Sequence, residues 1–153
     1  MPGSVARPEN IHGTAILIGE RGVLITGPSG AGKTTLALTL IDHCRARGLF
    51  SRLIADDRLL AAAHGGRLVC RAPATIAGLA EVPGFIPSPL PFEPGGVIDL
   101  HIRLVPGAEM ARFQEDISVP VAACPVPRID LAERNAATAL PAVMARLSIP
   151  PFS

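Results

Sequence analysis

Tryptophan and tyrosine are absent from the 153 residues, and only five phenylalanines are present. Aromatic platforms for stacking nucleic-acid bases are therefore nearly excluded. The formal net charge is +1 and 18% of the residues are charged, so the chain has no basic field for nucleic acid and no acidic tail. Any partner has to be recognised by local chemistry, and a core has to be built from Ala, Leu, Ile and Val.

Cysteine is also scarce: Cys44, Cys70 and Cys124 lie far apart and form no CxxC pair. This number and spacing predict neither a disulfide framework nor a zinc site, and they fit a reducing cytoplasm. No stretch reaches the roughly 18 apolar residues that cross a bilayer, and the first residues lack the apolar core of a signal peptide. We expect a soluble, cytoplasmic, single-domain protein over residues 1–153, with residues 1–10 as a flexible tail.

The first third of the chain has the clearest pattern. The runs "IHGTAILIG" and "GVLIT" have the length and composition of strands. After the glycine-rich stretch "GPSGAGKT", apolar residues recur at helical spacing from Thr34 until Gly48 provides a stop. The sequence therefore predicts a strand, a loop and a helix in succession.

The remaining pattern predicts a mixed sheet. "SRLIADD" is a short strand, and "RLLAAAHGGRLVCRA" is a hairpin that turns at His64. Residues 82–96 are crowded with proline and glycine, so we expect an irregular surface loop there. "VIDLHIRLV" predicts another strand, "GAEMARF" one or two helical turns, and "AERNAATALPAVMARL" a C-terminal helix disturbed at Pro141.

"GPSGAGKT" matches the Walker A pattern GxxxxGK[ST] in full. In this pattern the glycines let successive backbone N–H groups curl around phosphates, the lysine brings a cation to them, and the final hydroxyl can ligate Mg²⁺. A glycine-rich turn that matches by chance is the alternative, and the flanking strand and helix disfavour it. The predicted nucleotide-binding residues are Gly27, Pro28, Ser29, Gly30, Ala31, Gly32, Lys33, Thr34 and Thr35.

Two adjacent carboxylates, Asp56 and Asp57, follow the strand in "LIADD". One carboxylate at such a strand end commonly assists Mg²⁺, and a second that points elsewhere is free to accept a proton. The spacing alone also fits carboxylates that cap the following turn.

Taken together, "IHG", "VLITGPSGAGKT" and "LIADD" resemble the catalytic domain of the HPr kinase/phosphorylase family, bacterial enzymes that phosphorylate a serine of the phosphocarrier protein HPr. The resemblance implies a P-loop-type three-layer α/β fold with a mixed β-sheet, related to phosphoenolpyruvate carboxykinase. It implies ATP and Mg²⁺ as cofactors, HPr or a close relative as protein substrate, no nucleic-acid or membrane partner, and a homo-oligomer, since the family forms hexamers. Residues 1–153 would then be one P-loop kinase catalytic domain. Some proteobacteria have such a short form, which lacks the family's N-terminal domain.

The same resemblance assigns roles residue by residue. His12 becomes the active-site histidine near the transferred phosphate, Lys33 the phosphate-binding lysine and Thr34 a magnesium ligand. Asp57 becomes the base that takes the proton from the serine hydroxyl, and Asp56 supports the metal or orients its neighbour. Without the family, His12 would be more typical of a histidine at a strand end with no catalytic role.

A later stretch, "GLAEVPGFI", resembles a family signature in which a magnesium-binding glutamate precedes an arginine and a glycine-rich turn. Glu81 takes the place of the glutamate, with a surface glutamate before a turn as the alternative, but Pro83 stands where the arginine is expected. Because this signature is linked in the family to phosphorolysis, the removal of the serine phosphate by inorganic phosphate, we expect that activity to be doubtful here.

Arg112 in "EMARFQ" aligns with an arginine that would reach the γ-phosphate; an exposed helix arginine is the alternative. "ERN" at 133–135 is similar to a family "GRN" element and supports the alignment rather than the chemistry.

Two other functions stay open. A small-molecule P-loop kinase shares the Walker A motif and the length, but its lid should carry clustered arginines, and the sequence has no such cluster. A nucleotide-binding sensor without transfer activity is the second alternative, since Pro83 interrupts the signature. The NKxD motif of GTPases and the signature of ABC-type ATPases are absent.

Overall fold

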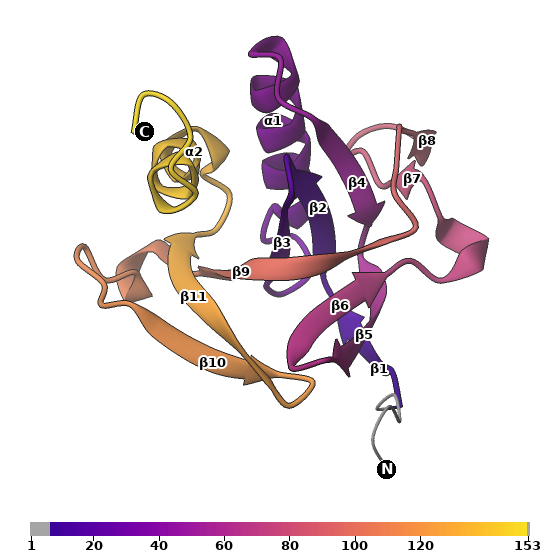
Figure 1. Cartoon of the computed structure of the whole chain (residues 1–153). Coiled ribbons are helices and arrows are strands. Elements are labelled where there is room, and N and C mark those ends of the chain that lie inside the picture. Colours follow the sequence, from indigo (N-terminus) through magenta and orange to yellow (C-terminus); the bar gives the residue numbers. More distant parts are fainter. Residues whose placement is uncertain (1–6, 153) are drawn as a thin grey trace.

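The computed structural model describes residues 7–152, in which nine strands form one mixed sheet with two α-helices on one face (Figure 1). The helices are α1 (Lys33–Ala46) and α2 (Ala136–Arg146). The strands of the sheet are β1 (Glu9–His12), β2 (Thr14–Ile18), β3 (Arg21–Thr26), β4 (Ser51–Ala55), β5 (Arg58–His64), β6 (Arg67–Arg71), β9 (Gly95–Val105), β10 (Ile117–Val121) and β11 (Cys124–Ala132). The short strands β7 (Leu79–Ala80) and β8 (Ser88–Pro89) pair with each other, and the 3-10 turns are η1 (Ala74–Ile76) and η2 (Gly107–Glu109).

The long strand β9 joins the two halves of the sheet. Its residues 95–97 pair antiparallel with β6, whereas residues 98–103 run parallel to β3 and residues 101–105 run parallel to β11. The main path of the sheet is therefore β1-β5-β6-β9-β3-β2-β4, with β11 and β10 attached to the far end of β9. Because β9 changes partners along its length, the sheet curls and carries the β5–β6 hairpin across the face opposite the helices (Figure 1).

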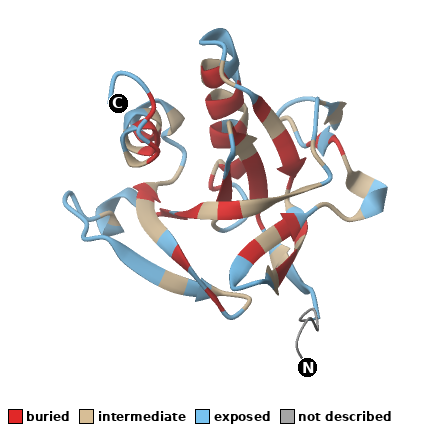
Figure 2. Cartoon of the chain, viewed as in Figure 1, coloured by how far each residue is buried: buried red, intermediate tan, exposed pale blue. Residues whose placement is uncertain are grey.

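Two buried clusters lie on the opposite faces of the central strands. On one face, Leu36 and Leu40 of α1 pack together with Val143 of α2 against apolar side chains of β2, β3 and β9. On the other face, Leu24 of β3 packs against the β5–β6 hairpin, including Cys70. Figure 2 shows this burial along the inner side of α1 and on the strands beside it. Removal of these apolar surfaces from water is the main force that holds the layers together.

The prediction of a mixed sheet is confirmed, but the layers differ from a sheet covered by helices on both faces. Helices α1 and α2 contact each other and share one buried cluster with the sheet. Within residues 7–152, the opposite face is covered by the β5–β6 hairpin of the curled sheet rather than by an α-helix. The helices span 14 and 11 residues, and in this part of the chain none is long and apolar enough to cross a membrane.

Most local predictions for residues 11–71 are confirmed, but the run "IHGTAILIG" is divided at Gly13 into β1 and β2, which pair with different strands. Strand β3, the glycine-rich loop and α1 follow one another as expected, and Arg47 and Gly48 end α1. The hairpin of β5 and β6 turns after His64. Cys44, Cys70 and Cys124 are buried and unpaired, as expected for a chain without disulfides.

Several predictions for the second half were wrong. Residues 82–96 are not wholly irregular, since they include β8 and the first two residues of β9. The helical turns expected in "GAEMARF" shrink to η2, because the following residues lead into the β10–β11 hairpin, which the sequence did not indicate. The C-terminal helix begins only at Ala136 and continues through Pro141, since burial of Ala139, Val143 and Met144 offsets the lost backbone hydrogen bond.

Strand β1 occupies part of the segment that was expected to be a tail. It begins at Glu9 and pairs antiparallel with β5. Residues 7 and 8 have no regular structure, and the other residues of the predicted tail, 1–6, lie outside the described part of the chain. The start of the sheet is therefore closer to the N-terminus than the pattern predicted.

Gly22 lies where β3 begins to pair with β9, and its missing side chain allows the two backbones to approach. A Cβ built at this position would overlap the carbonyl oxygen of Val97 and lie 2.8 Å from the Val97 carbonyl carbon. The Gly22 N–H also donates to the carboxylate of Asp99 at 3.0 Å. The parallel pairing that brings β9 beside β3 thus requires glycine here.

We predict that Gly22→Ala destabilises the protein, because the added methyl group meets backbone atoms that cannot move without breaking the β3–β9 pairing. The expected loss is about 1–3 kcal/mol of unfolding free energy, the usual cost of overpacking a closed site. Urea unfolding measures it, with Gly107→Ala as the matched control, since the nearest atom to a Cβ there is 4.0 Å away. Equal urea midpoints for the two variants would contradict the proposed close approach.

Candidate active site

The phosphate loop, defined here as Gly27–Thr34, connects β3 to the first turn of α1. Gly30 and Gly32 have φ angles of 80° and 94°, in the left-handed region that favours glycine. Ala31 between them is fully buried, and its N–H donates to the Pro28 carbonyl at 3.0 Å. The loop is therefore a tight, internally bonded turn at the N-terminus of a helix, where backbone N–H groups and the helix dipole favour an anion.

Lys33 brings a positive charge into this loop. Its side chain is buried, and its ammonium group donates to the carbonyl oxygens of Gly27 at 2.8 Å and Pro28 at 3.1 Å. Among the described residues no carboxylate forms a salt bridge with it. A buried cation held only by neutral carbonyls leaves a net positive charge available for a phosphate group.

A buried histidine supports the strand that leads into the loop. Thr26, the last residue of β3, has its hydroxyl 2.6 Å from Nε2 of His101 on β9. Burial, together with the positive charges of Arg128 and Arg103, lowers the pKa of His101 to about 4. His101 is therefore neutral at pH 7 and links β3 to β9 by a neutral hydrogen bond.

The carboxylate of Asp56 connects three segments of the site. It is 3% exposed. Its Oδ1 accepts hydrogen bonds from the hydroxyls of Thr14 and Thr34, each at 2.8 Å, and its Oδ2 accepts one from the backbone N–H of Glu81 at 2.6 Å. These donors belong to β2, to the first turn of α1 and to the segment after β7. Asp56 thus fixes the Thr34 hydroxyl and the start of the Glu81 segment relative to each other.

The next residue, Asp57, turns its side chain in another direction. Its φ angle is 68°, in the left-handed region, and its backbone carbonyl accepts a hydrogen bond from the N–H of Gly13 at 3.0 Å. The Asp57 carboxylate lines a pocket beside the phosphate loop, and its Oδ1 lies 3.5 Å from Nε2 of His12. The predicted divergence of the two adjacent carboxylates is therefore present in the structure.

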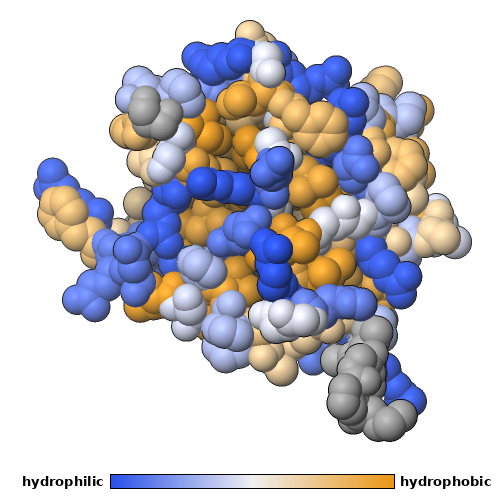
Figure 3. Space-filling view, viewed as in Figure 1, coloured by the Kyte–Doolittle hydropathy of each residue, from blue (hydrophilic) through white to orange (hydrophobic). Residues whose placement is uncertain are grey.

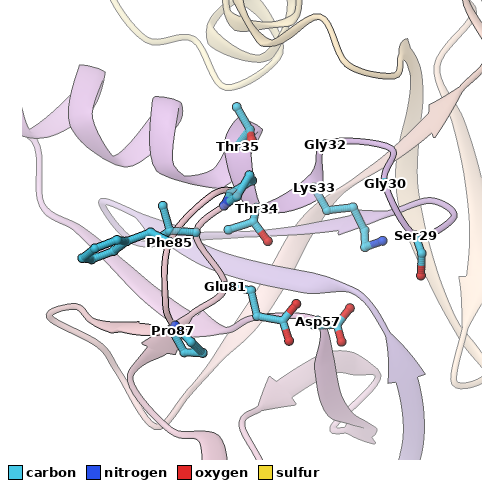
Figure 4. Close-up of a pocket in the computed structure, with 12 residues that line it drawn as sticks. Ser29, Gly30, Gly32, Lys33, Thr34, Thr35, Asp57, Glu81, Phe85 and Pro87 are labelled. Carbon is cyan, nitrogen blue, oxygen red and sulfur yellow. The ribbon is translucent and has the colours of Figure 1, made fainter.

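The pocket has a volume of about 440 Å³ and lies between the phosphate loop and the segment after β7. Figure 4 shows the carboxylates of Asp57 and Glu81 across the pocket from Lys33 and Thr34. The rest of the lining is Ser29, Gly30, Gly32 and Thr35 on the loop side and the apolar side chains of Val82, Pro83, Phe85 and Pro87 on the other. One end of the pocket is thus polar and charged, and the other is apolar.

The donor set of the pocket fits a magnesium ion that is shared with a phosphate ligand. The described residues contain no group of three or more His, Cys, Asp or Glu side chains that could hold a metal alone. The pocket does offer the Thr34 hydroxyl and the Glu81 carboxylate, which are hard oxygen ligands. Mg²⁺ commonly takes one or two protein oxygens and completes its shell with water and substrate phosphates. Asp56 fits an indirect role, because its oxygens already accept three hydrogen bonds.

The structure therefore brings together most of the residues predicted from the sequence. Glu81, Asp57 and six of the phosphate-loop and helix residues face one pocket, His12 contacts Asp57 from outside it, and Asp56 lies beneath it. Gly27 and Pro28 contribute their carbonyl groups to Lys33 rather than lining the pocket.

Arg112 is the predicted site residue that the structure does not bring there. It lies between η2 and β10, in a segment that projects from the side of the molecule (Figure 1 and Figure 3), and it is not in a helix. Its guanidinium carbon lies 5.4 Å from the centre of the neighbouring Phe113 ring, and it does not line the pocket. That prediction rested on the resemblance alone, and the alternative of an exposed arginine agrees with the structure.

A residue without a predicted chemical role, Arg134, contacts the phosphate loop directly. Its backbone N–H donates to the Ala31 carbonyl at 2.8 Å, and its guanidinium donates to the Gly30 carbonyl at 3.2 Å. The sequence indicated only that "ERN" supports an alignment. The position of this stretch immediately before α2 could have indicated the contact, because α2 packs against α1 and α1 begins in the phosphate loop.

The chain is similar in sequence to known proteins of one family. A family model described as "HPr Serine kinase C-terminal domain" matches residues 3–122. HPr kinase/phosphorylase of Levilactobacillus brevis is 35% identical over 122 residues, and that of Latilactobacillus sakei is 40% identical over 122 residues. Each alignment covers 79% of this chain and 33% of the relative, so the chain spans about a third of the length of these curated relatives.

A solved structure shares the fold. The Hpr(Ser) kinase/phosphatase from Coxiella burnetii superposes with a TM-score of 0.72 at 22% sequence identity. The superposition covers 91% of this chain and 95% of that one. The curled mixed sheet with its helices is therefore the architecture of that structure as well.

The geometry predicts that Asp56→Asn destabilises the protein more than Asp57→Asn. The NH₂ group of an asparagine at position 56 would face either the two hydroxyls or the Glu81 N–H. A hydroxyl can rotate and accept a hydrogen bond, but the Glu81 N–H can only donate and would lose its acceptor. The expected cost is about 1–3 kcal/mol, as for a buried donor left without an acceptor. Asp57→Asn is the matched control, because asparagine tolerates the left-handed conformation and, among the described residues, His12 is the one ion-pair partner of the Asp57 carboxylate. Urea unfolding compares them, and an equal loss in both variants would contradict the role of Asp56.

Proposed function

The chain belongs to the family of HPr serine kinase C-terminal domains, and on this basis we propose that it is an ATP- and Mg²⁺-dependent protein serine kinase that phosphorylates HPr or a close relative. The observation that carries the proposal is the position of Asp57, which faces the same pocket as Lys33 and Thr34. A proton acceptor opposite a phosphate loop is what transfer of a phosphoryl group to a hydroxyl requires.

The phosphate loop would bind the nucleotide phosphates. Backbone N–H groups of the loop and the Lys33 ammonium would contact their oxygens, with Lys33 leaving the carbonyls of its own loop. Thr34 and Glu81 would hold Mg²⁺, which neutralises charge on the phosphates when it is bound. Asp56 would hold the Thr34 hydroxyl in position for this, since that hydroxyl donates its proton to Asp56 and leaves its oxygen free.

Asp57 would act as the general base. The serine oxygen forms a bond to the γ-phosphorus, the bond between that phosphorus and the β–γ bridging oxygen breaks, and ADP leaves with the electron pair. The hydroxyl proton passes to the Asp57 carboxylate, and the reverse reaction returns it. His12, 3.5 Å from Asp57, would keep the carboxylate turned toward the pocket.

Phosphorolysis is a weaker expectation for this chain. Pro83 lies in the apolar part of the pocket lining, at the position where the family arginine is expected. Within residues 7–152, Lys33 is the one Lys or Arg side chain that lines the pocket. Attack of inorganic phosphate on a serine phosphate brings two anions together, so fewer cations in the pocket disfavour it.

We predict that Asp57→Asn abolishes most transfer to HPr while Mg²⁺-ATP binding is retained. Loss of a positioned general base costs about 10²- to 10⁴-fold in rate, and the amide leaves Lys33 and Thr34 unchanged. The measurement is single-turnover transfer of radiolabelled phosphate from saturating Mg²⁺-ATP to purified HPr, with ATP affinity measured in parallel. Asp42→Asn is the matched control, since Asp42 is an exposed residue on α1 and does not line the pocket.

The same assay separates the alternatives. A variant that transfers within about threefold of the parent would make Asp57 a structural residue, because a base contributes at least about a hundredfold. A parent that binds Mg²⁺-ATP but transfers nothing to HPr would favour a nucleotide sensor or a different acceptor, including a small molecule.

A second prediction concerns the reverse direction. When phospho-HPr is incubated with the protein, Mg²⁺ and excess inorganic phosphate, we expect pyrophosphate to form much more slowly than HPr is phosphorylated, because Pro83 replaces a cation. Pro83→Arg should raise the pyrophosphate rate if it restores that charge. Rapid pyrophosphate formation by the parent, at a rate similar to phosphorylation, would show that another group supplies the charge.

A further inference from the structure

We propose that Arg134 is a positioning residue that holds the phosphate loop in the shape that receives phosphates. This inference rests on the proposed function only in naming phosphate as the ligand of the loop. Arg134 lies in the connection between β11 and α2, far from the loop in sequence, and its guanidinium is a side-chain donor to a phosphate-loop carbonyl from outside the loop.

Two consecutive carbonyl groups of the loop are fixed by Arg134. The guanidinium Nη1 donates to Gly30 O at 3.2 Å, and the backbone N–H donates to Ala31 O at 2.8 Å. In a trans peptide the C=O and the following N–H point in opposite directions. A hydrogen bond on Ala31 O therefore fixes the direction of the Gly32 N–H, and one on Gly30 O fixes that of the Ala31 N–H.

These amides have different uses. The Ala31 N–H already donates inside the loop, to Pro28 O at 3.0 Å. The Gly32 N–H donates to no backbone carbonyl among the described residues, and Gly32 lines the pocket. The N–H that Arg134 orients by its own backbone bond is thus one that is available to a ligand.

The chain holds Arg134 in place by unusual means. Its φ angle is 54°, a left-handed conformation that is uncommon for a residue with a side chain. The preceding residue, Glu133, donates its N–H to Val105 O at 2.8 Å, which ties the connection to the end of β9. A Cβ built on Gly32 would lie 3.4 Å from Arg134 Cα, so the two backbones are in close contact.

Apart from its bond to the phosphate loop, the Arg134 side chain contributes little to the stability of the fold. It is 67% exposed, and at 3.1 Å it forms an ion pair with the adjacent Glu133, whose side chain is 13% exposed. Because the Arg134 end of the pair lies in solvent and joins neighbours in the sequence, the pair contributes little to global stability. Loss of the side chain should therefore affect the loop and leave the unfolding transition nearly unchanged.

The test uses Arg134→Ala and Arg134→Lys in the full chain, with Arg67→Ala as the matched control. Arg67 is 65% exposed and pairs with Asp99 at 3.5 Å, but it does not contact the phosphate loop. Backbone amide exchange at Ala31 and at residue 134 is measured by NMR in the ligand-free protein, and the affinity for Mg²⁺-ATP by calorimetry. Urea midpoints are recorded for all variants.

Arg134→Ala keeps the backbone bond to Ala31 O and loses the side-chain bond to Gly30 O, so the loop is less restrained. We expect this variant to exchange these amides faster and to bind Mg²⁺-ATP up to roughly tenfold more weakly, the effect of losing about one hydrogen bond. Arg134→Lys should recover part of both effects, because lysine can donate to one carbonyl, and Arg67→Ala should match the parent. If the parent bound no Mg²⁺-ATP, the proposed function would fail, yet faster loop exchange in Arg134→Ala would still support positioning. Unchanged exchange at both amides, or faster exchange throughout the protein, would overturn it.

Discussion

The buried carboxylate of Asp56 is the interaction on which the site depends. A carboxylate that is removed from water must have its oxygens hydrogen-bonded, because an unpaired buried charge is costly. Asp56 meets this requirement with donors from β2, from the first turn of α1 and from the N–H of Glu81. The strand end, the phosphate loop and the wall that carries Glu81 are therefore held in one arrangement by a single side chain.

The backbone conformation after Asp56 explains how two neighbouring carboxylates serve different purposes. Asp57 has a left-handed φ angle of 68°, so its side chain leaves the buried network and faces the pocket near His12. The first carboxylate is fully engaged in hydrogen bonds, and the second is open to a ligand. This division matches the chemistry that we propose, in which one carboxylate organises the metal and phosphate side and the other accepts a proton.

Much of this could be predicted from the sequence, because the requirements are local. Glycines at left-handed positions, a lysine and a hydroxyl within eight residues define the phosphate loop, and "LIADD" ends a buried strand. The failures involve long-range structure. The hydrogen bond from Arg134 to Gly30 joins residues 104 positions apart, and the curl of the sheet depends on β9 changing partners, for which hydrophobic periodicity gives no signal. Arg112 was misplaced because its role rested on the resemblance alone, whereas the residue is exposed between η2 and β10.

The proposed chemistry requires the phosphate loop and Asp57 to face the same phosphoryl group. A crystal structure of the protein with Mg²⁺ and a non-hydrolysable ATP analogue tests it most directly. We expect the Lys33 ammonium to leave Gly27 O and Pro28 O and contact a phosphate. Thr34 should bind the metal, and the Asp57 carboxylate should face the γ-phosphate without binding the metal. A nucleotide bound outside the loop, or Asp57 turned away from the γ-phosphate, would contradict it.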